Sequence, residues 1–193
     1  MQGDFGELVQ RLHQGDAAAA EQIVRDHEPE IRRIVRSRLR DPKLRRIVDS
    51  IDICQSVFGR FFVQATLGRF ELNSQKDLVK LLTRMATNKV IDKHRAEASQ
   101  RRLSLHKAEN QNGNHQYGEP VQQQISPESA MVYEELYHSA EASLSEKEKT
   151  ISNLRNQGMS WLDVSRELGE SPQALRKRLE RACNRIAKEM GID

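Results

Sequence analysis

The sequence predicts an all-α protein made of two small helical domains joined by a flexible linker, with a helix-turn-helix in the C-terminal domain. Aromatic residues make up only 5% of the 193 residues and charged residues 31%, which is typical of helical proteins whose cores are built from Leu, Ile, Val and Ala. Apolar residues return at helical spacing along most of the chain. One polar segment without this spacing separates the two periodic regions.

The first domain is predicted over residues 1–100. Apolar residues recur at helical spacing from Ala17 to Arg40, and we expect Pro29 to begin a new helix after a short break. The segment "RDPKL" then predicts a turn. Two more helices are predicted, from about Asp49 to Gly68 and from about Gln75 to Ala98, with "GRFELNSQ" as the loop between them.

The linker is predicted over residues 101–128, because this segment is rich in Asn, Gln and Gly and has almost no periodic apolar residues. Helical spacing resumes in residues 129–193, the second predicted domain. Early in that domain, Ser145 and Glu148 have the spacing of a capping box, and Gly158 suits the end of a helix.

A helix-turn-helix is predicted after Gly158. Ser160 can cap a helix that stops at Gly169, and Ser171 can cap the next helix, which begins at Pro172. In this second helix one face is apolar and the opposite face is basic. The apolar residues are Leu175, Leu179, Ala182, Ile186 and Met190, and the basic residues are Arg176, Lys177, Arg181, Arg185 and Lys188.

A basic helix entered by a sharp turn suits the major groove of DNA. Its early side chains can reach base edges, and its later cations can neutralise phosphates and release counterions. Gln173 and Arg176 lie early enough to contact bases. A basic helix face by itself is plain hydrated surface about as often as it is a DNA-binding face. The capped helix and the glycine turn before it favour DNA binding here.

The segment "GMSWLDVSRELGESPQALRKRLERACNRI" resembles the C-terminal promoter-reading domain of extracytoplasmic-function (ECF) sigma factors of bacterial RNA polymerase. The matching positions are Gly158, Ser160, Val164, Leu168, Gly169, Ser171, Leu175, Arg176, Arg178, Leu179, Arg181 and Ala182. The departures are Asp163, Ser165, Pro172 and Gln173, and the last two lie where bases are read. The resemblance implies that the minus-thirty-five duplex is contacted by Ser171, Pro172, Gln173, Arg176, Lys177, Arg178 and Arg181.

The first domain resembles the promoter-melting domain of the same family in "VDSIDICQSVFGRFF" and "LLTRMATNKVIDKHR", which occur in the family's order and close to its spacing. The resemblance implies that Asp52, Gln55 and Ser56, on the polar flank of their helix, dock on the clamp of the largest polymerase subunit. It also implies that a second helix, with the loop "ELNSQKD", holds the melted non-template strand of the minus-ten element. The residues of this strand-capture set are Arg84, Asn88, Lys89, Asp92, Lys93 and Arg95.

The strand-capture set has the chemistry that a single strand requires, namely cations for the backbone and an amide for a base edge. Unlike many relatives, this chain has no Trp or Tyr between the first matching segment and the linker. We therefore expect polar capture of the flipped base rather than stacking on aromatic rings. The basic run at residues 31–46 has apolar residues at helical spacing within it, and we interpret it as a hydrated helix that attracts DNA only diffusely.

The partners implied by the resemblance are core RNA polymerase and promoter DNA, both as duplex and as melted strand, with an anti-sigma protein as one candidate regulator. The resemblance implies no cofactor and no catalytic residue. A helix-turn-helix repressor or activator that works without polymerase is the alternative, but it leaves the match in the first domain unexplained. A metal enzyme is disfavoured, because none of the six histidines has ligand spacing and no phosphate-binding loop or nucleophile motif occurs.

The compartment is predicted from what the sequence lacks. Cys54 and Cys183 lie far apart and outside any C-x-x-C motif, which fits a reducing environment. The first residues contain no apolar stretch of signal-peptide length, and no later run approaches the length of a membrane span. These features predict a cytoplasmic protein without membrane insertion.

Overall fold

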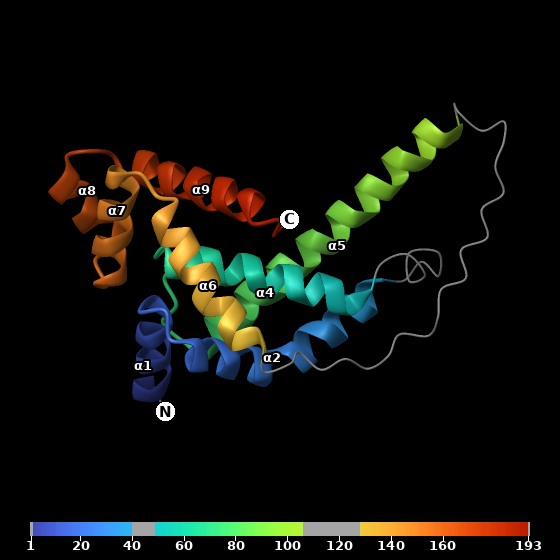
Figure 1. Ribbon diagram of the computed structural model, residues 1–193, viewed down its shortest axis with the longest axis horizontal. Helices are drawn as coiled ribbons and strands as arrows, with labels where there is room; N and C mark the ends of the chain where they lie inside the picture. Colours follow the sequence, from blue (N-terminus) through green and yellow to red (C-terminus); the bar gives the residue numbers. More distant parts are fainter. Residues whose placement is uncertain (1, 40–48, 106–127, 193) are drawn as a thin grey trace.

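The computed structural model describes residues 2–39, 49–105 and 128–192 of the chain (Figure 1). These residues form helices and connecting turns, with no strand among them, and the all-α prediction is confirmed. The helices are α1 (Gln2–His13), α2 (Ala17–Arg38), α4 (Ser50–Thr66), α5 (Gln75–Leu105), α6 (Glu128–Ala142), α7 (Glu146–Asn156), α8 (Trp161–Leu168) and α9 (Pro172–Glu189).

Helices α2, α4 and α5 pack against one another and form the centre of the molecule. The N-terminus of α4 is capped by Asp49, whose carboxylate accepts a hydrogen bond from the Ile51 amide at 2.9 Å. Phe61 of α4 is fully buried, and its ring lies 5.3 Å from that of Phe62 and 6.1 Å from that of Phe70. Burial of such large rings supplies much of the stabilisation of a core.

Helix α2 corrects the prediction of a break before Pro29. It runs without interruption from Ala17 to Arg38, and Pro29 lies inside it. Proline removes one helical hydrogen bond, but here it faces solvent, whereas Ile23 and Ile31 on either side of it are fully buried. We attribute the continuity of the helix to this packing on both sides of the proline. The predicted turn "RDPKL" and residues 40–46 of the basic run lie outside the described residues.

Helix α1 was not predicted, and helix α5 is longer than predicted. The prediction ended α5 near Ala98, but the helix continues to Leu105, into the segment predicted as linker. The first half of α5 buries Leu78, Leu82, Ala86 and Val90. From Ile91 to Ser99 most side chains are exposed, and the second half of the helix projects away from the rest of the molecule (Figure 1). Residues 106–127 of the predicted linker lie outside the described residues.

The helix-turn-helix prediction is confirmed in its local geometry. The Ser160 hydroxyl accepts a hydrogen bond from the Asp163 amide at 3.3 Å, and the Ser171 hydroxyl accepts one from the Ala174 amide at 3.2 Å. Gly169 ends α8 in the left-handed conformation, with φ of 68°, which glycine adopts without steric cost. The apolar face of α9 is buried, with Leu175, Leu179, Cys183 and Ile186 fully so.

Helix α6 packs on α2 and α4, two helices of the N-terminal part of the chain. Tyr133 of α6 is buried, and its hydroxyl donates to the Leu12 carbonyl at 2.9 Å. Its ring meets the Phe62 ring of α4 edge-on, with the centroids 4.9 Å apart. The buried apolar core is therefore continuous between the helices before residue 105 and those after residue 128.

Candidate nucleic-acid interface

The residues predicted to read duplex DNA lie on the outer side of α9 and in the turn before it. Five of them are exposed, namely Ser171, Gln173, Arg176, Lys177 and Arg181, whereas Pro172 and Arg178 are partly buried. Arg178 is held by the Glu170 carboxylate at 2.8 Å, and Lys147 pairs with the same carboxylate. These two cations lower the pKa of Glu170, so that Glu170 stays ionised and fixes Arg178 at the turn.

Trp161 of α8 provides a platform for two guanidinium groups. Arg155 lies 4.6 Å and Arg176 5.7 Å from the centroid of its ring, both within the range of a cation–π contact. Arg176 is thereby oriented while it stays exposed. Trp161 is itself buried, and the sequence gave no sign that its ring would support the proposed base-reading arginine.

The strand-capture set lies on the solvent side of α5, opposite the buried Leu82, Ala86 and Val90. Five of its six members are exposed, and Lys89 is partly buried. The structure brings four of them to one cavity of about 460 Å³ between α4, α5 and α9, whereas Lys93 and Arg95 lie outside it. The four lining residues are Arg84, Asn88, Lys89 and Asp92.

The other walls of this cavity contain two cations that sequence reasoning missed. Arg60 of α4 donates to the Asn184 side-chain carbonyl of α9 at 3.0 Å, and Arg69, just after α4, pairs with Glu180 of α9 at 2.8 Å. The sequence indicated only that Arg60 lies one helical turn after Ser56, and therefore on the same flank of α4. The partners on α9 could not be inferred, because they lie more than a hundred residues away along the chain.

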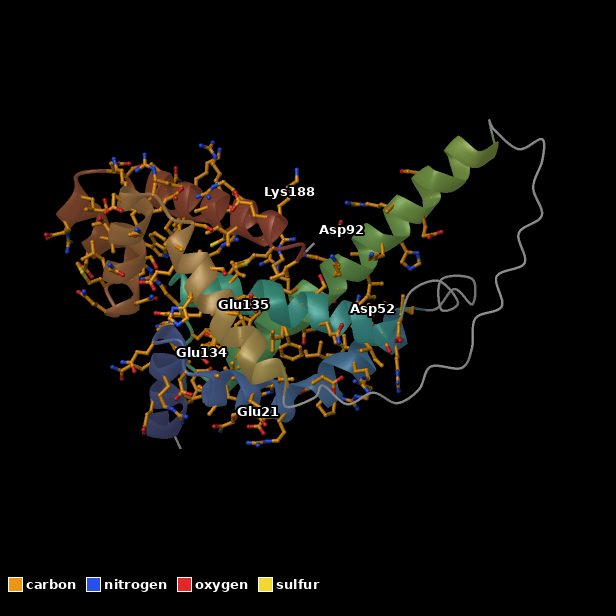
Figure 2. The ribbon with its side chains drawn as sticks, in the orientation of Figure 1. Glu21, Asp52, Asp92, Glu134, Glu135 and Lys188 are labelled. Carbon is orange, nitrogen blue, oxygen red and sulfur yellow. The ribbon has the colours of Figure 1, made fainter. Side chains whose placement is uncertain are left out.

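The residues predicted to contact polymerase lie along one flank of α4. Asp52 and Gln55 are exposed, and Ser56 is partly buried and lines the cavity. Figure 2 shows Asp52 near the beginning of α4, at the opposite end of that helix from α7. The neighbouring residues Ile53 and Cys54 point into the core, so the predicted separation of polar and apolar flanks is confirmed.

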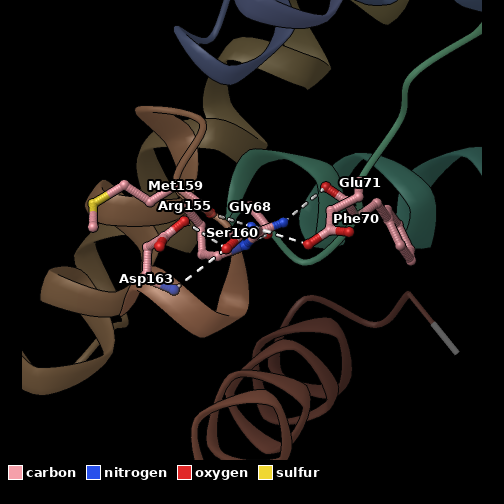
Figure 3. Close-up of polar contacts among 7 residues, drawn as sticks. All are labelled: Gly68, Phe70, Glu71, Arg155, Met159, Ser160 and Asp163. Carbon is pink, nitrogen blue, oxygen red and sulfur yellow. Dashed lines mark hydrogen bonds and ion pairs between the residues drawn. The ribbon is translucent and has the colours of Figure 1, made fainter. Parts of the chain in front are cut away.

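Arg155, near the end of α7, is a buried charge that sequence reasoning also missed (Figure 3). Its side chain is 4% exposed and forms an ion pair with Glu71 at 3.3 Å. Its Nε donates to the Gly68 carbonyl at 3.1 Å, and another guanidinium nitrogen donates to the Met159 carbonyl. Burial lowers the pKa of Arg155, and Glu71 opposes this shift.

Within the described residues, no group of three or more His, Cys, Asp or Glu side chains is placed to hold a metal ion. Both cysteines are buried free thiols, and burial raises the pKa of each to about 12. In the same part of the chain, no helix combines the length and the apolar character that crossing a membrane requires.

A family model described as "ECF sigma factor" matches residues 2–191, nearly the whole chain. No curated protein matches the chain. The family match covers both the segment that carries the strand-capture set and the helix-turn-helix.

Proposed function

Since the chain belongs to the ECF sigma factor family and therefore acts in transcription initiation, we propose that it binds core RNA polymerase and recognises promoters through two separate surfaces. One surface is α9, which would enter the major groove of the minus-thirty-five element. The other is the exposed face of α5, which would hold the melted non-template strand of the minus-ten element. Such a factor would work in the cytoplasm, without a cofactor and without covalent chemistry of its own.

The observation that carries this proposal is the geometry of the helix-turn-helix. Two capped helices meet at a left-handed glycine, and the second presents Gln173, Arg176 and Lys177 to solvent near its beginning. The N-terminal residues of a recognition helix are those that reach base edges. Arginine can donate two hydrogen bonds to guanine, and glutamine can pair in a similar way with adenine.

The role of α5 is supported by the mixture of groups on its exposed face. Arg84 and Lys89 can neutralise phosphates, and the Asn88 amide can hydrogen-bond to the edge of an unstacked base. These three side chains line the same cavity, so a captured nucleotide would meet all of them. Asp52, Gln55 and Ser56 on α4 would bind the clamp of the largest polymerase subunit. They form a polar flank on a well-buried helix, with Asp52 and Gln55 exposed and Ser56 partly buried.

Run-off transcription from a promoter library tests the proposal directly, with core polymerase alone and with this protein added. We expect new start sites that share two spaced sequence elements. If no transcription is gained while the protein binds duplex DNA without polymerase, the protein is a helix-turn-helix repressor or activator instead. The shared elements would also provide the promoter consensus.

A further inference from the structure

The cavity of about 460 Å³ between α4, α5 and α9 is lined by a row of polar side chains from each helix. α4 contributes Arg60 and Gln64, which are four residues apart, and α5 contributes Arg84 and Asn88 at the same spacing. Residues at this spacing share one face of a helix, so each row is directed at the same space. The volume lies in the range of pockets that bind small molecules.

Positive charge exceeds negative charge among the lining residues, with four cationic side chains against two carboxylates. The cations are Arg60, Arg69, Arg84 and Lys89, and the carboxylates are Asp92 and Glu180. Glu180 is already paired with Arg69 at 2.8 Å. Arg84 is exposed and has no carboxylate partner among the described residues. A cleft with an excess of one charge concentrates ions of the opposite sign, so the cavity favours an anionic ligand.

Gln64 distinguishes this cavity from a charged surface groove. It is only 5% exposed, and yet it lines the cavity. Its carboxamide has no hydrogen-bond partner within the part of the chain that the structure describes. Buried polar groups nearly always have a partner, and an unpaired one is costly. A ligand that carries both a donor and an acceptor would satisfy this amide, since a carboxamide offers one of each.

Apolar side chains complete the lining. Val57 of α4, Leu81 and Met85 of α5, and Phe70 in the loop between these helices all face the cavity. The Phe70 ring is packed against the fully buried Phe61 ring, with the centroids 6.1 Å apart and 8° between the planes, and this packing fixes its orientation. Such a surface suits a planar heteroaromatic ring, because the bases of nucleotides stack on aromatic side chains.

We propose that this cavity is a binding site for a nucleoside triphosphate. The base would lie against the apolar side chains and exchange hydrogen bonds with the Gln64 carboxamide. The phosphates would be bound by Arg60 and Arg84, since a guanidinium group can donate two hydrogen bonds to one phosphate. A nucleotide combines the three properties that the cavity requires, namely a polyanion, a planar ring and a ring edge with both donors and acceptors. This ligand site goes beyond the proposed function and does not depend on it.

Calorimetric titration of the full-length protein with ATP tests the site. The salt concentration should be about 0.15 M, because diffuse attraction between charges is then strongly screened. We expect saturable binding of one ATP per chain. Adenosine lacks the phosphates and tripolyphosphate lacks the base, so each should bind at least about tenfold more weakly than ATP. Absence of saturable ATP binding, or equally tight binding of tripolyphosphate, would overturn the proposal.

Arg84→Ala tests the phosphate contact. We expect the affinity for ATP and for tripolyphosphate to fall by about tenfold, because charged hydrogen bonds are lost. The matched control is Arg33→Ala, which removes the same charge from an exposed position on α2 that does not line the cavity. Equal losses in the two variants would show diffuse attraction to a basic protein instead of a defined site.

Gln64→Leu tests the base contact and keeps the approximate size of the side chain. The affinity for ATP should fall by about fivefold, whereas that for tripolyphosphate should not change. The thermal unfolding midpoint of the ligand-free variant should not fall, because the Gln64 carboxamide has no partner in the described part of the chain to lose. A clear fall in that midpoint, or an equal loss for both ligands, would contradict the assignment of this amide to the base.

The titrations contain neither polymerase nor promoter, so they can fail separately from the proposed function. If the wild-type protein gives no promoter-specific transcription but the titrations show the expected pattern, the proposed function fails and the nucleotide site stands. If the protein directs transcription but does not bind ATP in the free state, the nucleotide site fails and the proposed function stands.

Discussion

At the scale of single residues, Arg155 links the two halves of the molecule most directly. Its guanidinium satisfies the Gly68 and Met159 carbonyls and faces the Glu71 carboxylate, all with 4% of the side chain exposed. A buried charge is tolerated only when it is paired and hydrogen-bonded. The Gly68 and Met159 carbonyls accept hydrogen bonds from Arg155, so its loss would leave these carbonyls without that donor.

Replacement of Arg155 by methionine keeps much of the volume but removes every donor. We expect Arg155→Met to lower the free energy of unfolding by about 2–4 kcal/mol, because buried acceptors lose their partners. Urea denaturation measures this change. Arg166→Met is the control, because the Arg166 side chain is 71% exposed and such surface changes shift stability by about 0.5 kcal/mol or less. Equal effects of the two substitutions would contradict the role given to Arg155.

Gly68 and Gly169 have nearly the same backbone conformation in different surroundings. Their φ values are +70° and +68°, but a Cβ at Gly68 would meet Arg155 at 2.6 Å, whereas nothing lies within 4 Å of one at Gly169. Both substitutions to alanine incur the strain of a positive φ, about 1 kcal/mol. Only Gly68→Ala also forces Arg155 to move. Gly68→Ala should therefore lower the thermal unfolding midpoint clearly more than Gly169→Ala does, and the reverse order would show that the close packing is unimportant.

At the scale of elements, α5 and α9 have the same amphipathic pattern but are proposed to have different functions. Each buries an apolar face and exposes a row of polar and basic residues. α9 is preceded by a capped turn that orients it as a recognition helix, whereas α5 carries its row in the middle of a long helix. A recognition helix suits base edges in an intact groove, and the row on α5 suits an unpaired strand.

This division of labour predicts different kinetic defects for two alanine variants. Arg176→Ala should weaken closed-complex binding and relax base preference, at a cost of about 1–3 kcal/mol for a lost base contact. Asn88→Ala should leave closed-complex binding nearly unchanged and slow promoter opening. Filter binding at low temperature and permanganate reactivity of the melted strand separate the two steps. Equal effects of both variants on both steps would contradict the assignment.

At the scale of the whole molecule, one continuous apolar core joins helices that lie far apart in the sequence. α6 packs on α2 and α4, and the buried Tyr133 donates to the Leu12 carbonyl of α1. Among these packed helices, the imidazole of His27 is buried and that of His13 is partly buried. Burial lowers the pKa of His13 and of His27, and the positive charge of Arg155 lowers that of His13 further.

The shifts of these histidines predict how stability depends on pH. In the unfolded chain they titrate near pH 6.5, and in the folded protein their pKa values are lower. Below pH 6.5 the unfolded state therefore binds more protons, and the free energy of unfolding falls as the pH falls. Urea midpoints at pH 7.5 and 5.5 should show this loss, and His27→Gln should reduce it. A midpoint independent of pH over this range would refute the prediction.

The features that the sequence determined by itself are local. The caps at Ser160 and Ser171 bind amides three residues away, and the left-handed glycine at position 169 acts on its own backbone. Such contacts form within one helical turn, so residue type and spacing are sufficient to predict them. For the same reason the exposed rows on α4, α5 and α9 could be predicted, since periodicity alone separates the two faces of a helix.

Only the tertiary structure decided which faces meet. Arg155 and Gly68 are 87 residues apart, Arg69 and Glu180 are 111 apart, and Arg60 and Asn184 are 124 apart. Packing also kept α2 continuous through Pro29, where local propensity predicted a break. Periodicity states which side of a helix is buried but not what covers it, because the partner depends on how the whole chain closes on itself. The contacts of α9 with α4 and with the loop after α4 are therefore a property of the folded molecule.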